Sequence, residues 1–236
     1  IRGKQKVRTV QGELEKVIKK LPGFKGKIYG ASRTDAGVHA KGQVVEFRTM
    51  SKLPPLTWIR ALNYYLPRDI AVKAACEVDE NFNVRRNALS REYRYYIVNS
   101  SERTPLRRKF AQLVPEPLDV EAMNLACQIL IGEHDFTPFA PSLGNERDSG
   151  VRTVYIAETR KKSDIVAFDI IANSFLPHQV RSTVGGLIKV GTGKMKIGTF
   201  WEMAVSKMMG VVGPLAPPYG LFMMKVNYPS FLREQN

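Results

Sequence analysis

Apolar residues recur at helical spacing in several segments, and this pattern predicts most of the helices of the chain. The clearest case is residues 9–21, where Thr9 is suited to cap the first turn and Pro22 ends the segment. The apolar face of this helix consists of Val10, Leu14, Val17, Ile18 and Leu21. We expect further helices over residues 56–66, 120–131, 177–190 and 200–209.

Segments rich in apolar residues with period two lie between these helices and predict strands. The alternation is regular in residues 165–172, where Val166, Phe168 and Ile170 share one face. The full set of expected strands is 27–31, 43–49, 70–78, 91–99, 151–159, 165–172 and 221–228. Because strands and helices alternate without a strict βαβ rhythm, we predict an α+β fold with largely antiparallel sheets.

Length and proline content suggest a division of the chain into two parts. Its 236 residues suit one large domain or two small ones. Residues 100–118 contain three prolines and a basic run from Arg107 to Lys109, which is typical of a connection. We therefore divide the chain into residues 1–105 and 106–236.

Positive charge is concentrated in the first half of the sequence. Residues 1–118 carry 24 Lys and Arg against 11 Asp and Glu, whereas residues 119–236 carry 12 against 11. The net charge of +14 favours a polyanionic partner, most often a nucleic acid, over a merely solvated basic surface. No segment pairs a basic face with a strongly apolar one, and no apolar run approaches the roughly 18 residues of a membrane span, so we expect no membrane partner.

Thiols, imidazoles and glycine loops give no indication of a metal or nucleotide site. Cys76 and Cys127 lie far apart, and no closely spaced Cys or His pair completes a zinc ligand set, so we expect two buried free thiols and no metal. The segment Gly191-Thr192-Gly193-Lys194 is not a phosphate-binding loop, because Ile188 stands where that motif requires glycine.

The loop between the strands 27–31 and 43–49 places a carboxylate beside a guanidinium. Asp35 lies two residues from Arg33 in a stretch of small residues, where a ligand and the backbone can approach closely. A nearby guanidinium can keep a carboxylate ionised and oriented, as a nucleophile or base requires. The alternative is a tight turn in which Asp35 bonds to its own backbone. His39 could serve Asp35 as a base, although a packing role suits it better.

Two further segments combine charged and aromatic groups. In residues 91–96, Arg91, Tyr93 and Tyr95 share one strand face, an arrangement suited to RNA phosphates and bases but equally to a buried core. On the predicted helix 177–190, Arg181 follows His178 by about one turn on a largely apolar segment. Arg181 is either buried and ion-paired or directed along the surface to solvent.

Together these motifs resemble the TruA family of tRNA pseudouridine synthases. The family signature is Gly-Arg-Thr-Asp-Ala-Gly-Val-His-Ala, and Arg33 to Ala40 match it, with Ser32 in place of the first glycine. Further matches run in the family's order and cover nearly the whole chain. They are Thr9-Val10-Gln11 with Leu14-Glu15, Asn63 with Leu66-Pro67-Asp69-Ile70, Arg91 with Tyr93-Arg94-Tyr95, Gly132 to Phe136, Arg152-Thr153, the helix from Phe175 to Gly185, and Ala216-Pro217 with Gly220-Leu221.

The beginning of the sequence departs from the family pattern. Family members usually start with a strand containing Tyr-Asp-Gly and a Gly-Trp-Gln segment before the first helix. The sequence starts at Ile1 and lacks both motifs. We expect the edge of the sheet that this strand would cover to be unpaired.

The resemblance implies an isomerase that converts uridine to pseudouridine in tRNA without metal, redox cofactor or ATP. By resemblance, Asp35, Tyr93 and Arg181 are the catalytic residues. Asp35 would be the nucleophile, Tyr93 would stack on the flipped uracil and take its C5 proton, and Arg181 would pair with Asp35. Arg33, Tyr93 and Arg91 would bind RNA, with Arg33 steering the flipped nucleotide or filling the space that it leaves.

The resemblance also implies an architecture and partners. It predicts a two-lobed fold with largely antiparallel mixed sheets, flanking helices and a central RNA-binding cleft. Residues 1–105 would form the basic lobe with Asp35, and residues 106–236 would complete the active site and the dimer interface. We expect a cytoplasmic or organellar homodimer that modifies the anticodon stem-loop of tRNA, usually at positions 38 to 40. The alternatives are a tRNA-binding module without chemistry and a small hydrolase built on Asp35 and His39.

Overall fold

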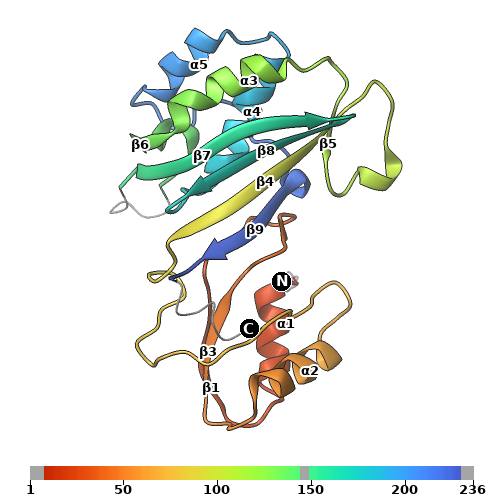
Figure 1. Cartoon of the computed structure of the whole chain (residues 1–236), viewed down its shortest axis with the longest axis vertical. Helices are drawn as coiled ribbons and strands as arrows, with labels where there is room; N and C mark the ends of the chain where they lie inside the picture. The colour runs from red at the N-terminus through yellow and green to blue at the C-terminus, as the bar shows by residue number, and fades with distance from the viewer. Residues whose placement is uncertain (1–7, 144–148, 230–236) are drawn as a thin grey trace, which may run out of the picture. The chain divides into compact units, whose positions relative to one another are not determined.

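A computed structural model describes residues 8–143 and 149–229, which divide into two compact units (Figure 1). The first, the small unit, draws its described residues from Ile1–Ser32, Val44–Ala88 and Tyr228–Asn236. The second, the sheet unit, comprises Arg33–Gln43 and Leu89–Asn227. The loop that carries Asp35 therefore belongs to the sheet unit, although the small unit surrounds it in sequence.

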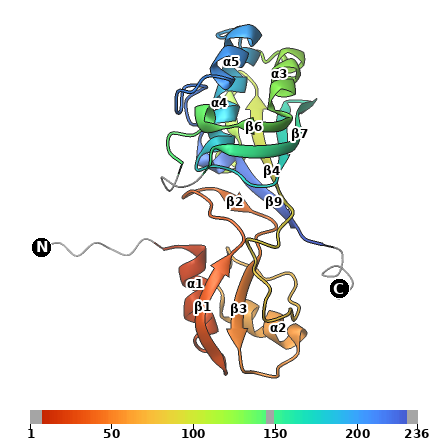
Figure 2. The ribbon, with the colours of Figure 1, turned by 90° about the vertical axis from the view of Figure 1, so that its left-hand side faces the viewer.

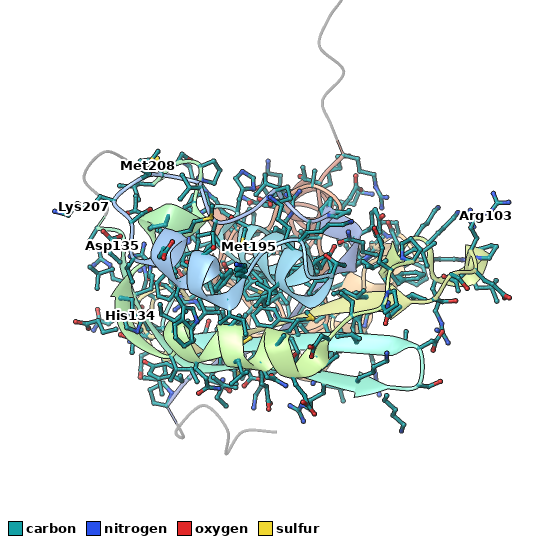
Figure 3. All side chains as sticks on the ribbon, turned by 90° about the horizontal axis from the view of Figure 1, so that it is seen from above. Arg103, His134, Asp135, Met195, Lys207 and Met208 are labelled. Carbon is teal, nitrogen blue, oxygen red and sulfur yellow. The ribbon has the colours of Figure 1, made fainter. Side chains whose placement is uncertain are left out.

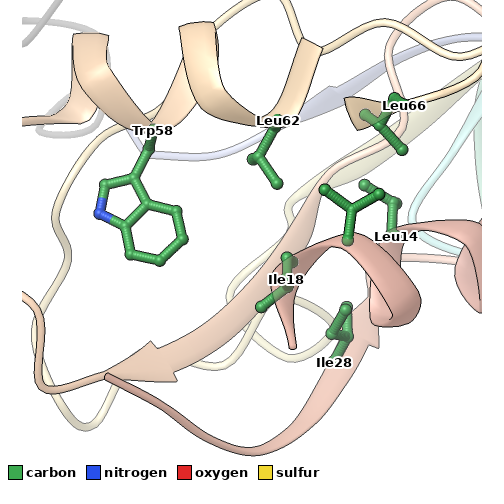
Figure 4. Close-up of a cluster of buried hydrophobic side chains, with 7 residues drawn as sticks. Leu14, Ile18, Ile28, Trp58, Leu62 and Leu66 are labelled. Carbon is green, nitrogen blue, oxygen red and sulfur yellow. The ribbon is translucent and has the colours of Figure 1, made fainter. Parts of the chain in front are cut away.

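The small unit packs two helices against a two-stranded antiparallel sheet. Its elements are α1 (Val10–Ile18), β1 (Phe24–Gly30), β3 (Val45–Thr49) and α2 (Pro55–Tyr65). Thr9 caps α1 as predicted, because its Oγ1 accepts the Gly12 amide at 3.0 Å. The core in Figure 4 consists of Leu14, Val17, Ile18, Ile28, Trp58, Leu62 and Leu66. Burying these side chains against one another stabilises two helices that would be marginal alone.

One predicted strand of the small unit is absent, since residues 70–78 form no strand. Val72 instead bonds to the side chain of Asn63 on α2. The Val72 amide donates to Asn63 Oδ1 at 2.7 Å, and Asn63 Nδ2 donates to the Val72 carbonyl at 2.8 Å. Ile70 and Val72 also pack against the core of this unit. Their apolar alternation reflects contact with that core rather than pairing within a sheet.

The sheet unit is built on seven strands in the order β2-β9-β4-β8-β7-β6, with β5 paired to β4. Their bounds are β2 His39–Ala40, β4 Ser90–Asn99, β5 Gln112–Val114, β6 Gly132–Asp135, β7 Val151–Lys162, β8 Ile165–Ala172 and β9 Leu221–Asn227. The pairs β2·β9 and β4·β5 are parallel, and the other pairs are antiparallel. The connection after β4 carries Arg103, which lies at the opposite end of this unit from His134 and Asp135 of β6 (Figure 3).

Three helices, α3 (Val120–Cys127), α4 (Gln179–Gly191) and α5 (Ile197–Ala204), cover one face of this sheet (Figures 1 and 2). Most of α4 is buried, and glycines allow other segments to approach it closely. A Cβ on Gly185 would collide with the carbonyl oxygen of Pro214. Short 3₁₀ helices complete the unit at Pro105–Arg107, Gln128–Leu130, Thr137–Phe139 and Pro218–Gly220.

The prediction of an α+β fold with a largely antiparallel mixed sheet and flanking helices is confirmed. The helix expected over 120–131 is α-helical only to Cys127 and continues as a 3₁₀ turn before Gly132, whose φ of 107° suits glycine. The expectation of two buried thiols is half wrong, because Cys76 is exposed whereas Cys127 is buried. The boundary at residues 105 and 106 falls inside the sheet unit, and the assignment of roles to its two sides stays a prediction.

Candidate active site

The Asp35 carboxylate is bound by two side chains of the segment that begins α4. Asp35 Oδ2 accepts a hydrogen bond from Arg181 Nη1 at 2.7 Å and lies 2.8 Å from His178 Nδ1. The backbone carbonyl of Asp35 accepts the Val38 amide at 3.1 Å, so the residue does lie in a turn. Its side chain, however, is directed to α4, and among the described residues it makes no bond to its own backbone.

The loop that carries Asp35 is attached to strand β9. His39 is in register with Phe222 in the parallel pair β2·β9, and the Lys41 amide donates to the Met223 carbonyl at 2.8 Å. Gly37 has a φ of 86° and lies against Pro218, a conformation that favours glycine. These contacts hold the loop at β9, in addition to the bonds from Arg181 and His178, and thereby restrict the position of Asp35.

Arg181 is held at two points and is largely buried. Its side chain is only 13% exposed, and its Nε donates to the Ala216 carbonyl at 2.7 Å while Nη1 reaches Asp35. The structure therefore shows Arg181 as a largely buried, ion-paired residue rather than a surface arginine directed to solvent. Because a guanidinium is charged throughout the physiological pH range, it supplies a fixed positive charge beside the carboxylate.

His178 is a site residue whose contact with Asp35 the sequence did not reveal. It immediately precedes α4 and has a φ of 62° and a ψ of −1°, in the left-handed region that residues with a Cβ rarely adopt. The one signal in the sequence was its spacing of about one helical turn from Arg181. That spacing places two side chains on neighbouring positions but does not indicate what they contact.

Tyr93 and Tyr95 lie on the helix-covered face of the sheet. Tyr93 is 6% exposed and meets the ring of Phe175 edge-on at a centroid distance of 5.2 Å. Tyr95 is fully buried, and its hydroxyl lies 2.9 Å from both Gln112 Oε1 and the Pro217 carbonyl. Burial raises the pKa of Tyr95 well above its ordinary value, so its hydroxyl stays protonated. Tyr95 thus supports the segment that also contacts Arg181 through Ala216.

The two arginines predicted to bind RNA differ in their surroundings. Arg33 is exposed on the Asp35 loop. Arg91 is 7% exposed, and its Nη1 donates to the Asn173 carbonyl at 2.6 Å. A guanidinium in that position holds β4 to the segment after β8, and its role toward RNA stays a prediction.

His39 has packing contacts and does not serve as a partner of Asp35. Its ring stacks on Phe222 at a centroid distance of 4.6 Å, lies near Phe110, and its Nε2 is 2.8 Å from the Lys109 carbonyl. These contacts support the packing interpretation of His39. The geometry therefore gives no support to a hydrolase that uses His39 as the base for Asp35.

Groups of metal ligands and membrane-spanning helices are both absent from residues 8–143 and 149–229. No three His, Cys, Asp or Glu side chains in these ranges gather as metal ligands would. None of the helices there has both the length and the apolar character needed to cross a bilayer.

Comparison with known proteins places these features in a family. The family model described as tRNA pseudouridine synthase matches residues 1–86 and 126–229. A tRNA pseudouridine synthase A from Geobacillus sp. (strain WCH70) is 42% identical over 224 residues, which cover 94% of this chain and 89% of the relative. The protein of that name from Roseiflexus castenholzii is 43% identical over 227 residues, covering 94% of this chain and 83% of the relative. The match to the family model and the identity to these relatives over most of both sequences show that the chain belongs to the tRNA pseudouridine synthase family.

Proposed function

We propose that this chain isomerises uridine to pseudouridine in tRNA, within the anticodon stem-loop at positions 38 to 40, and that Asp35 is the nucleophile. The observation that carries the proposal is the Asp35 carboxylate, held in place by Arg181 and His178. A nucleophilic carboxylate has to be ionised and oriented, and these two partners supply a fixed charge and a second hydrogen bond.

The reaction breaks one bond of the nucleotide and forms another. The N1–C1′ bond of uridine is cleaved, the uracil turns, and C5 bonds to C1′. C5 then loses its proton and N1 gains one, so the product is an isomer of the substrate. Asp35 either attacks C1′ or assists removal of the 2′ proton, and both routes need an ionised carboxylate near the sugar.

The target uridine has to leave its stack before Asp35 can reach it. Extruding a base costs a few kcal/mol of stacking and pairing. In this proposal the exposed Arg33 steers the flipped nucleotide or fills the space that it leaves. Tyr93 stacks on the uracil and its hydroxyl takes the C5 proton at the end of the reaction.

The proposal also includes how tRNA is bound and how the protein assembles. The basic residues of the first half bind tRNA phosphates, and Arg91 contributes to the RNA-binding surface. The enzyme acts as a cytoplasmic homodimer with a two-lobed fold and a central cleft for tRNA. Residues 1–105 form the lobe that carries Asp35, and residues 106–236 complete the active site and the dimer interface. These features follow from the family resemblance.

Tritium release from tRNA transcribed with 5-tritiated uridine tests the proposal, with wild type and Asp35→Asn assayed in parallel. We expect release by wild type only, and tRNA affinity of the variant within a few-fold of wild type. Substantial release by Asp35→Asn would exclude Asp35 as the nucleophile. Binding without release by either protein would favour a non-catalytic tRNA-binding module. Mapping pseudouridine in the product tRNA tests positions 38 to 40 separately.

A further inference from the structure

We infer that His178 is a positioning residue that, together with Arg181, holds Asp35 Oδ2, so that the other carboxylate oxygen, Oδ1, is the one that reacts. This inference rests on the proposed role of Asp35 as the nucleophile. It assigns different tasks to two chemically equivalent oxygens and gives His178 a role that the sequence did not indicate.

Both bonds to the Asp35 carboxylate end on the same oxygen. Arg181 Nη1 lies 2.7 Å and His178 Nδ1 2.8 Å from Oδ2. Oδ1 has no hydrogen-bond partner among the described residues. An oxygen that accepts two bonds, one of them from a cation, has its charge compensated and is the poorer nucleophile. The structure therefore leaves Oδ1 as the more reactive oxygen of the pair.

One bond alone would not distinguish the two oxygens. A carboxylate held at a single point can rotate about its Cβ–Cγ bond, whose torsional preference is broad, and exchange Oδ1 with Oδ2. Arg181 cannot follow such a rotation freely, because its Nε is bonded to the Ala216 carbonyl at 2.7 Å. The second donor, His178 Nδ1, reaches the same oxygen from a different direction. Two donors in fixed positions thus set the orientation of the carboxylate plane.

The backbone around His178 is held in an uncommon conformation. Its φ of 62° is unfavourable for a residue with a Cβ and persists where surrounding contacts determine it. Reciprocal bonds close the turn on either side of His178: the Gln179 amide donates to the Leu176 carbonyl at 3.2 Å, and the Leu176 amide donates to Gln179 Oε1 at 2.8 Å. Gln179 is completely buried, so this turn is a fixed part of the fold. It presents His178 to Asp35 just before α4 begins.

The protonation of His178 follows from its partner. A carboxylate oxygen only accepts hydrogen bonds, so Nδ1 has to carry a proton to bond with Asp35 Oδ2. This requirement holds for the neutral imidazole with its proton on Nδ1 and for the cation. A side chain that offers a donor at the same branch position can therefore replace the imidazole, whereas one without a donor cannot.

A matched pair of variants separates the hydrogen bond from the backbone conformation. His178→Gly keeps the left-handed conformation and removes the donor. His178→Asn tolerates that conformation and places its Nδ2 donor at the position of the imidazole Nδ1. The measurement is the single-turnover rate of tritium release with enzyme in excess over 5-tritiated tRNA, together with the Kd for tRNA. Thermal unfolding of each variant verifies that it is folded.

We expect His178→Gly to slow the single-turnover rate about 10- to 100-fold, the value of a hydrogen bond to a charged group, while the Kd changes less than about threefold. His178→Asn should restore most of the rate. A wild-type rate for His178→Gly would overturn the inference, as would an Asn variant as slow as the Gly variant. Release by Asp35→Asn in the same assay would instead exclude Asp35 as the nucleophile, the proposed role on which this inference rests.

A second pair covers the case in which His178→Gly fails to fold. His178→Asp has nearly the same shape as His178→Asn and tolerates the same backbone conformation, but it places an acceptor of like charge against Asp35. We expect the Asp variant to be at least 10-fold slower than the Asn variant at saturating enzyme. Equal rates for the two variants would overturn the role of a donor at this position.

Discussion

The small unit and the sheet unit differ in the distribution of charge and buried structure. The residues of the small unit include 17 Lys and Arg against 8 Asp and Glu, whereas the larger sheet unit has 19 against 14. The small unit has a two-stranded sheet, and the sheet unit has seven strands covered by three helices. Excess charge is therefore densest in the unit that does not contain Asp35, Tyr93 and Arg181.

Under the proposed function, this difference places two physical requirements in separate units. Attraction of a polyanion needs only positive charge near the surface, and it tolerates mobile side chains. Nucleophilic chemistry needs groups held in a fixed geometry, which buried packing and two-point hydrogen bonding supply. We therefore expect changes in the small unit to act mainly on tRNA affinity and changes in the sheet unit to act mainly on turnover and stability.

The largest effect is expected from Tyr93→Phe in the sheet unit. The variant keeps the ring against Phe175 and loses the hydroxyl that we propose takes the C5 proton. Because general base catalysis is worth about 10²- to 10⁴-fold, the single-turnover rate of tritium release should fall by at least about 100-fold at unchanged tRNA affinity. Tyr96→Phe, on the opposite face of β4, serves as the control and should keep its rate. Full activity of Tyr93→Phe would leave the ring with a stacking role alone.

The next largest effect is expected from Gly185→Ala in α4. Its Cβ would collide with the Pro214 carbonyl and displace the segment whose Ala216 carbonyl binds Arg181. Overpacking should lower the free energy of unfolding by about 1–3 kcal/mol and also slow turnover. Gly198→Ala in α5 is the control, since an added Cβ there would meet no atom within 4 Å apart from its chain neighbours and the backbone of its own helix. That variant should be stabilised by roughly 0.5–1 kcal/mol, as measured by urea unfolding.

A smaller effect is expected on the free energy of unfolding at alkaline pH, from the buried thiol of the sheet unit. Burial raises the pKa of Cys127 in the sheet unit from its ordinary value of 9.0 to about 12. Between these values the unfolded chain loses a proton that the folded chain retains. The free energy of unfolding should therefore fall with rising pH by up to about 1.4 kcal/mol per pH unit.

Unfolding measured from pH 8 to 10.5 checks this slope. Cys127→Ala should remove the part of the pH dependence of the free energy of unfolding that the Cys127 thiol contributes. Cys76→Ala, which removes the exposed thiol of the small unit, is the matched control variant. An identical pH dependence in wild type and Cys127→Ala would contradict the expectation.

The smallest effect concerns charge on the surface of the small unit. Lys19 and Lys20 come directly after the last residue of α1, and both are exposed. Replacing both with Gln should weaken tRNA binding a few-fold and lower the salt slope of log Kd by about 1 for each phosphate that the protein no longer binds. The rate at saturating enzyme should not change. The control is the pair Lys161 and Lys162 of the sheet unit, also exposed, for which an equal weakening of tRNA binding would contradict the comparison.

Local patterns in the sequence were sufficient to predict most of the helices and strands. Thr9 was expected to cap α1 because capping depends on a side chain and an amide three residues apart, and the structure shows this bond. The apolar alternation of residues 165–172 likewise predicted β8 correctly. The strand expected over 70–78 was wrong because alternation cannot distinguish sheet pairing from contact with a neighbouring helix, here through Asn63.

The contacts around Asp35 could not be predicted from local sequence patterns. Spacing alone left Asp35 as either a turn residue or a reactive group, and only the family resemblance linked it to Arg181. The contact of His178 depends on a left-handed backbone and on a partner 143 residues earlier. The two-residue strand β2 is too short to produce a pattern and forms only because β9 lies beside it.

The attachment of the Asp35 loop has a consequence for the order of folding. The loop is held by α4, which begins more than 140 residues later in the chain, and by β9, which follows later still. Contacts at such separations close long loops and form late. Because the ribosome makes the chain from its N-terminus, Asp35 emerges long before α4 and β9 have been synthesised. We therefore expect a growing chain to form α1, α2 and their core first and to orient Asp35, the proposed nucleophile, only when β9 has been made. A chain that ends before β9 should then not carry the reaction.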